Sequence, residues 1–435
     1  MKLLILTNLF PPSYIGGYEL GTLEIADYLH SIGHEITVLT SNSQQMEFSP
    51  LRDYEVLRIL ENAESEGFKK GFCWIDSYLF QEKNLEAIEK IIKEKKIEYI
   101  MQFNTRGLGI FGIYTLIQYL RLPGIVYLMD NIYRGKACLL AQGSELSTLT
   151  TQSFRNKDIV VMSHQLLDQI RPYIGGSQES VFEIPGWIPG GINIVENRKT
   201  SLPLESKLIF SSRISEHKGA FLLLASFRKF LEIYPDFTGS LDFYGEGEVN
   251  KLQLMIKNLE LERWVSYKGS LVKKEMIEVF REYDALVFPT WKEEAFGYVV
   301  IEAMSQGCIP LATSQIGSTA NLENSYDFIS LEPEIHSIVA ALEFFIGLDS
   351  QSRIEMKINT QKTAGKYSFE ESMKKLDSLL MKNCSKSNQQ DTSESGSEYA
   401  QSIVASYKSG LRNLPISERS RLALSLPYLR RKNWC

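Results

Sequence analysis

A short stretch with two glutamates is the part of the sequence best suited to chemistry. In residues 291–313, WKEEAFGYVVIEAMSQGCIPLAT, Glu294 and Glu302 stand eight residues apart, with Phe296 and Gly297 between them. A glycine lets backbone amides approach a ligand closely, and the N–H groups at a helix start suit phosphate or hydroxyl oxygens. The pattern predicts Glu294 before a helix and Glu302 about one turn inside it. Two solvated glutamates beside a buried helix are the alternative.

Two basic side chains form a second candidate group. Arg213 and Lys218 stand five residues apart after a β-prone run at residues 207–212. A strand end, a short loop and a Lys-Gly pair at a helix start would bring both cations and a helix dipole to one place. Such a place suits a diphosphate, and two exposed bases on a loop are the alternative.

The first part of the chain offers a glycine pair and an aspartate. Gly16 and Gly17 stand between a predicted strand and a predicted helix, with Glu19 close behind. Paired glycines there let the main chain face a phosphate or sugar oxygen, although most such pairs are only turns. Asp130 follows a predicted strand at 124–128, at the sheet edge where ligands of α/β proteins bind. For Asp130, an Asx turn or a helix cap is the alternative.

Alternating strands and helices would position these residues. In the first half we expect strands at 2–7, 35–40, 56–60, 99–103, 124–128, 159–162 and 180–184, and helices near 18–31, 84–94 and 108–119. In the second half we expect strands at 207–212, 240–243, 265–267, 286–289 and within 307–312, and helices near 248–259, 332–347 and 350–366. Continuous apolar strands separated by helices predict an α/β chain with two doubly wound domains.

Breaks in this alternation suggest the domain limits. Prolines and glycines between 185 and 191, followed by the polar segment 196–204, predict a boundary near residue 200. Residues 384–398, CSKSNQQDTSESGSE, have the composition of a disordered linker. The basic run 430–432 beside Tyr428 and Trp434 could contact an anionic membrane or a partner, and a solvated, loosely docked helix is the alternative.

Composition narrows the class of protein. A chain of 435 residues exceeds one core, and 44% hydrophobic with 23% charged residues is usual for a soluble globular protein. The net charge of -6 argues against a general nucleic-acid binder. Five scattered cysteines suit a reducing compartment and suggest no metal cluster. The apolar run after Lys2 is short and lacks a cleavage site, so we expect a cytoplasmic protein, at most peripheral at the inner membrane face.

Together these motifs resemble a known family. The glutamate pair followed by Gly-Cys-Ile-Pro is similar to the donor-site signature of the retaining family 4 glycosyltransferases, which belong to glycosyl transferases group 1 and have the GT-B fold. The resemblance covers roughly residues 1–381 and implies two Rossmann-like doubly wound domains facing across a cleft. It implies an acceptor-side domain at 1–200, a nucleotide-sugar-binding domain at 201–366, a helix at 367–381 that crosses back, and a polar linker and basic tail at 382–435.

The resemblance also implies roles for particular residues. Arg213 and Lys218 would stabilise the diphosphate, and Glu294 would orient the sugar. The other donor contacts would come from Glu302 on the ribose, the backbone of Phe296, Gly297 and Tyr298 beside the sugar, Lys268 and Gly269 beside the nucleobase, and Gly16, Gly17 and Gly245 in the glycine-rich turns. Glu19 and Asp130 are candidates for the acceptor side of the cleft.

The implied activity is transfer of a hexose, with retention, from a UDP- or GDP-linked sugar to a glycan, lipid-linked or small-molecule acceptor, without cofactor or metal. The chain has no Asp-x-Asp pair, which the metal-dependent glycosyltransferase fold uses to bind phosphate. It also lacks the histidine that many relatives carry near Asp130, so a non-catalytic nucleotide-sugar-binding protein is one alternative. A 2-epimerase-like isomerase is another, but we see no clear set of acid and base groups for it.

Overall fold

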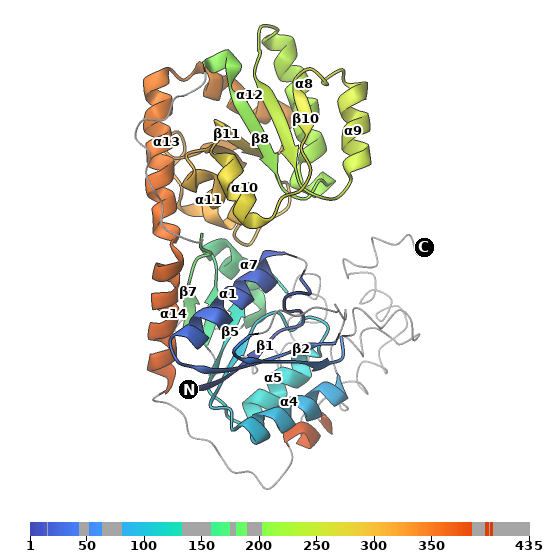
Figure 1. Cartoon of the computed structure of the whole chain (residues 1–435), viewed down its shortest axis with the longest axis vertical. Helices are drawn as coiled ribbons and strands as arrows, with labels where there is room; N and C mark the ends of the chain where they lie inside the picture. Colours follow the sequence, from blue (N-terminus) through green and yellow to red (C-terminus); the bar gives the residue numbers. More distant parts are fainter. Residues whose placement is uncertain are drawn as a thin grey trace. The chain divides into compact units, whose positions relative to one another are not determined.

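The fold consists of two compact units in a computed structural model (Figure 1). The structure describes residues 1–14, 16–42, 52–62, 81–132, 158–174, 180–188, 202–384, 396–399 and 401–402. Unit 1 contains Met1–Val161, Leu166–Ile184 and Lys375–Cys435, and unit 2 contains Met162–Gln165 and Pro185–Lys374. Unit 2 therefore includes two stretches that precede the predicted boundary near residue 200, Met162–Gln165 and the residues from Pro185 onward.

Unit 1 is built on a parallel sheet with the strand order β3-β2-β1-β4-β5-β6-β7. Its strands are β1 (Lys2–Leu6), β2 (Glu35–Ser41), β3 (Glu55–Leu60), β4 (Tyr99–Gln102), β5 (Gly124–Leu128), β6 (Asp158–Val161) and β7 (Val181–Glu183). The helices described in this part of the chain are α1 (Gly17–Ser31), α4 (Glu82–Lys95), α5 (Ile110–Tyr119) and α7 (His164–Ile174), whose first two residues belong to unit 2. Strands β4 and β5 are buried along their whole length, as expected for a sheet with helices on both faces.

Unit 2 contains a second parallel sheet with the order β10-β9-β8-β11-β12-β13. Its strands are β8 (Lys207–Ser211), β9 (Ser240–Tyr244), β10 (Val265–Tyr267), β11 (Ala285–Phe288), β12 (Ile309–Thr313) and β13 (Ile329–Leu331). The helices are α8 (Ala220–Ile233), α9 (Val249–Asn258), α10 (Lys273–Phe280), α11 (Tyr298–Ser305), α12 (Ile335–Gly347), α13 (Ser350–Ala364) and α14 (Phe369–Cys384), the last of which is shared with unit 1. Short 3-10 turns are η2 (Pro203–Glu205), η3 (Glu216–Lys218), η4 (Gly317–Asn321) and η5 (Gly365–Tyr367).

A buried polar network joins the sheet of unit 2 to α13. Lys357 Nζ lies 2.8 Å from Asp284 Oδ1, and the other carboxylate oxygen accepts the Lys207 N–H at 3.0 Å. The side chains of Lys357 and Asp284 are only 9% and 6% exposed. Because a buried charge is costly unless it is paired, this network fixes α13 against the entry to β8 and β11.

The C-terminal segment differs in part from its prediction. Helix α14 continues to Cys384, and residues 396–399 are helical. The expectation of a disordered linker therefore does not hold at 396–398. The basic run 430–432, like Pro189, Gly190 and Gly191, lies outside the described residues. No helix in the described ranges is long and apolar enough to cross a membrane.

Candidate functional site

The predicted donor residues of unit 2 gather at the carboxyl ends of its strands. Arg213 follows β8, Gly245 follows β9, and Lys268 and Gly269 follow β10. Backbone hydrogen bonds join these loops, from Ser212 N–H to the Tyr244 carbonyl at 3.2 Å and from Gly245 N–H to the Gly269 carbonyl at 2.8 Å. Parallel strands end at the same edge, and that edge is where α/β proteins bind ligands.

Lys218 and Glu294 form an ion pair at this edge. Lys218 ends η3, and its Nζ lies 2.5 Å from Glu294 Oε1 on the loop after β11. The two side chains are 18% and 20% exposed, so the pair is partly shielded but open to a ligand. The structure thus joins two of the three predicted catalytic residues. Arg213 is exposed on the neighbouring loop, and no contact described for it reaches this pair.

The loop that carries Glu294 is held by its backbone. Glu294 N–H donates to the Gln315 carbonyl, and the Glu294 carbonyl accepts the Gly317 N–H, both at 2.9 Å. Ser163 Oγ donates to the Ala295 carbonyl at 2.6 Å. These bonds fix the backbone of the loop on two sides, and the ion pair with Lys218 then orients the Glu294 carboxylate.

Phe296 and Gly297 serve this loop in different ways. The Phe296 side chain is 3% exposed and packs edge-on against the Tyr367 ring, so only its backbone can face a ligand. Gly297 precedes α11 with φ +77°, and an added Cβ would lie 2.3 Å from Ile316 Cγ2. Tyr298 then begins α11. The buried ring of Phe296 anchors the loop at the start of α11, and the backbone contact of these residues with a sugar stays a prediction.

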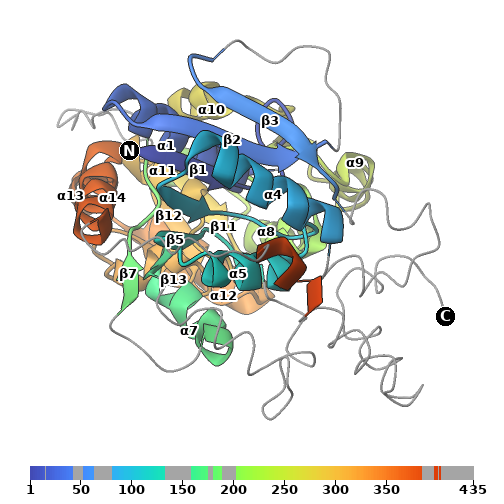
Figure 2. The same cartoon turned by 90° about the horizontal axis from the view of Figure 1, so that it is seen from below.

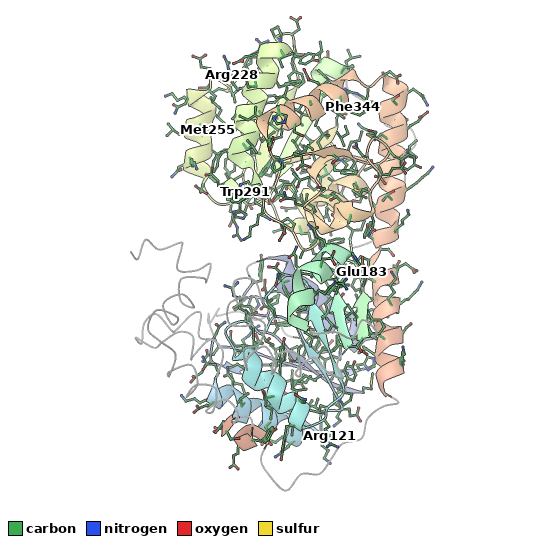
Figure 3. All side chains as sticks on the ribbon, turned by 180° about the vertical axis from the view of Figure 1, so that it is seen from behind. Arg121, Glu183, Arg228, Met255, Trp291 and Phe344 are labelled. Atoms are coloured by element: carbon green, nitrogen blue, oxygen red, sulfur yellow. The ribbon has the colours of Figure 1, made fainter. Side chains whose placement is uncertain are left out.

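A tryptophan missed by the sequence analysis connects this loop to η3. Trp291 Nε1 donates to the Glu216 carbonyl at 2.8 Å, and its backbone N–H donates to the His217 carbonyl at 3.2 Å. Thr290 Oγ1 donates to the same His217 carbonyl at 3.0 Å. Figure 3 places Trp291 at the opposite end of unit 2 from Arg228 and Phe344. These bonds hold the turn that carries Lys218 against the loop that carries Glu294.

Gly219, directly after Lys218, should not tolerate a side chain. Its φ is +80°, and an added Cβ would lie 2.2 Å from the Pro289 carbonyl oxygen. Gly219→Ala should therefore lower the free energy of unfolding of unit 2 by about 1–3 kcal/mol from backbone strain alone, measured by urea denaturation. Gly347→Ala, at a position with no atom within 4 Å of the new Cβ, is the control and should leave stability unchanged or slightly raised. Equal stability of the two variants would contradict this account.

Glu302 lies one turn inside α11, as predicted, and has a basic neighbour. The residue is 8% exposed, and Lys273 Nζ lies 3.9 Å from Glu302 Oε1 and 5.0 Å from the centre of the Tyr298 ring. Lys273 begins α10, a helix that we did not predict. The oxygens of the Glu302 carboxylate can accept hydrogen bonds from hydroxyl groups.

Lys268 points to a buried carboxylate. Its Nζ lies 3.7 Å from Asp242 Oδ1, while Asp242 Oδ2 accepts the Tyr283 hydroxyl at 2.7 Å. Burial, followed by hydrogen bonds with Tyr244 and Asp242, raises the pKa of Tyr283, so its hydroxyl remains a donor. Lys268 is therefore placed by Asp242, and the neighbouring Gly269 supplies backbone at φ +92° with open space where a Cβ would be.

The predicted residues of unit 1 surround the start of α1. Gly16 N–H donates to Glu19 Oε2 at 3.0 Å, and Glu19 is 3% exposed, so this glutamate caps α1. Gly17 is the first residue of α1. The Tyr18 hydroxyl donates to the Tyr127 carbonyl at 2.7 Å, and burial raises the pKa of Tyr18 well above its usual value. Asp130 is exposed just beyond β5, and its Oδ1 accepts the Asn131 N–H at 2.8 Å.

No three His, Cys, Asp or Glu side chains gather as a metal ion would require in the ranges that the structure describes. What the structure offers at the strand ends of unit 2 is a cation beside a carboxylate, a second carboxylate in a helix, and half-buried glycines at 245, 269 and 297. This combination suits a ligand with both phosphate and hydroxyl groups.

Comparisons with known proteins point the same way. Residues 196–363 match the family model described as glycosyl transferases group 1. A D-inositol 3-phosphate glycosyltransferase of Corynebacterium jeikeium is 25% identical over 206 residues, which are 45% of this chain and about half, 49%, of that relative's length.

Two solved structures resemble nearly the whole chain. A glycosyltransferase from Rickettsia africae aligns with TM-score 0.67 at 15% identity, covering 89% of this chain and 100% of that one. Anabaena HepE in complex with UDP aligns with TM-score 0.65 at 18% identity, covering 88% and 100%. The same Anabaena protein has also been solved with UDP-glucose. At these identities the likeness establishes the fold.

These findings identify the fold. The fold is GT-B, with two Rossmann-like parallel sheets, so the fold predicted from the sequence is confirmed. The stretch 196–363 that matches the glycosyl transferases group 1 model contains the Lys218–Glu294 pair.

Proposed function

We propose that the protein is a retaining family 4 glycosyltransferase that moves a hexose from a UDP- or GDP-linked donor without a metal ion. The acceptor is a glycan, a lipid-linked sugar or a small molecule. The Lys218–Glu294 pair carries the proposal, because it sets a phosphate-binding cation beside a carboxylate that can accept sugar hydroxyls. The UDP and UDP-glucose complexes of the Anabaena protein support the choice of donor class.

Each residue has a defined part in the proposed reaction. A bound donor exchanges the Lys218–Glu294 contact for two others: Lys218 binds the diphosphate, and Glu294 accepts hydrogen bonds from the sugar. Arg213, on the neighbouring loop, adds positive charge from its exposed position. Glu302 holds the ribose, and the backbone at Phe296–Tyr298 lies beside the sugar.

The transfer itself breaks the bond between the anomeric carbon and the diphosphate oxygen. An acceptor oxygen forms the new bond to that carbon on the same face, and its proton passes to the leaving phosphate. The negative charge that develops on the diphosphate is offset by Lys218 and Arg213, which act as preorganised electrostatic stabilisation. This route needs no protein base.

A donor panel tests the proposal. The full chain is incubated in excess chelator with UDP, GDP and ADP sugars, and nucleotide diphosphate release is followed with and without Glu294→Ala. Slow release from one donor, lost in the variant, is the expected result. Conversion of the sugar without release would instead indicate a 2-epimerase-like isomerase. Tight binding without release, with every donor and added acceptor, would indicate a non-catalytic binding protein.

Glu302→Gln tests the ribose contact separately. Because hydrogen bonds to a charged acceptor contribute about 1.5–3 kcal/mol, the variant should bind the nucleotide diphosphate about tenfold or more weakly in isothermal titration calorimetry. Glu278→Gln, an exposed glutamate of α10 paired with Arg281, is the control and should bind normally. Unchanged affinity of Glu302→Gln would remove this residue from the proposed site.

A further inference from the structure

A buried glutamate of unit 1 binds a segment more than 300 positions away in the chain. Glu89 on α4 is 4% exposed, and its two carboxylate oxygens accept the N–H groups of Gly396 at 2.8 Å and Ser397 at 2.6 Å. Figures 1 and 2 show the short red helical turn of residues 396–399 beside α4 and α5 from two directions. Glu89 therefore binds this segment through two of its backbone N–H groups.

Apolar and aromatic contacts with α5 accompany these hydrogen bonds. A Cβ at position 396 would lie 3.0 Å from Leu120 Cδ2 and 3.1 Å from Leu116 Cδ1, so the glycine packs closely on this helix. The Tyr399 ring stacks on Tyr119 with centroids 4.5 Å apart and an interplanar angle of 25°. The α4–α5 face thus accepts a residue without a side chain and, three positions later, an aromatic ring.

The segment in turn stabilises the charged carboxylate of Glu89. Burial raises the pKa of Glu89, but hydrogen bonds from Lys93, Ser397 and Gly396 together lower it to about 2. The carboxylate is ionised at neutral pH and lies 2.8 Å from Lys93 Nζ on its own helix. If the segment left, this buried carboxylate would lose two of its hydrogen bonds, which is costly for a charged group.

We propose that the α4–α5 face of unit 1 is a docking surface for residues 396–399 and 401–402 of the same chain, with Glu89 as the group that recognises the segment. Ser397 is 6% exposed in the docked state, and Gln401 Nε2 adds a hydrogen bond to Glu86 Oε1 at 3.2 Å. The surface recognises backbone amides, a glycine and a tyrosine, so it selects a short sequence rather than any apolar peptide. The proposal does not depend on the donor site.

Hydrogen–deuterium exchange of the full chain tests the docking. In the unchanged protein, the amides of Gly396 and Ser397 should exchange slowly, and Glu89→Gln should speed their exchange about tenfold or more. Glu94→Gln, at an exposed position of the same helix that pairs with Lys90, is the matched control and should leave the exchange unchanged. Equal exchange in Glu89→Gln and the unchanged protein would overturn the proposal.

A second variant tests the docking without a substitution in α4. Tyr399→Ala leaves Glu89 and its helix intact but removes the stacking on Tyr119, and it should also speed exchange at 396 and 397. Exchange at β1 and β4 should stay slow in both variants. If protection at 396 and 397 fell on dilution of the protein, the segment would come from a second copy, and docking within one chain would be disproved.

Discussion

Lys218→Ala should slow nucleotide diphosphate release from the donor by about 100- to 1,000-fold, the usual cost of removing one group that stabilises developing charge. The effect should fall mainly on kcat, because the leaving diphosphate gains charge as its bond to the sugar breaks. The variant would also leave Glu294 without the ion pair that now lies at 2.5 Å. Steady-state kinetics on the donor chosen by the panel would measure both effects.

The control for Lys218→Ala is another lysine of unit 2. Lys229 is 62% exposed on α8 and pairs with Glu232, so Lys229→Ala removes the same charge away from the strand ends. It should leave kcat within about twofold, because exposed ion pairs contribute little. If Lys218→Ala retained the kcat of Lys229→Ala, Lys218 would have no role in stabilising the leaving group.

Lys357→Ala should lower the free energy of unfolding of unit 2 by about 3–5 kcal/mol. The substitution removes the ammonium 2.8 Å from Asp284 Oδ1 and leaves a carboxylate that is 6% exposed without its charge partner. Asp284 keeps the hydrogen bond from Lys207 N–H and its electrostatic interaction with Arg353, but it loses the ammonium that lies 2.8 Å away. Urea denaturation followed by tryptophan fluorescence would measure the loss.

Two further variants separate charge from packing at this position. Lys374→Ala removes an exposed partner of Glu371 and should change stability by less than about 1 kcal/mol. Lys357→Met combined with Asp284→Asn removes both charges and should be more stable than Lys357→Ala, because the buried carboxylate charge is removed together with the ammonium. If the double variant were no more stable than Lys357→Ala, the cost would come from lost packing.

The strands were the easiest elements to predict from the sequence. The limits of β5 match its apolar run, because a strand covered on both faces must be apolar throughout. β13 was missed, and it is recognised in the structure by its pairing with β12, the strand before it in the chain. α10 was missed because only two of its eight residues, Met276 and Phe280, are buried.

The sequence indicated which residues belong to the candidate site, but it did not indicate which of them contact one another. Motif spacing indicated Lys218 and Glu294, yet 76 positions separate them, and nothing in either motif shows their ion pair. Lys273 was missed together with α10, although it lies beside Glu302. The structural role of Glu19 could have been found, because a glutamate three residues after a helix N-cap is the sign of a capping box.

The bond from Ser163 to Ala295 has a consequence for recombining enzymes of this fold. The loop that carries Glu294 is supported by residues that precede the domain boundary, since Gly186 also leaves room for the Phe296 ring, 2.4 Å from where a Cβ would be. A chimaera joined at residue 201 would pair this loop with foreign residues at both positions. Exchangeable modules must therefore carry residues 162–165 and 185–188 with the second domain, and these segments should covary with the loop among homologues.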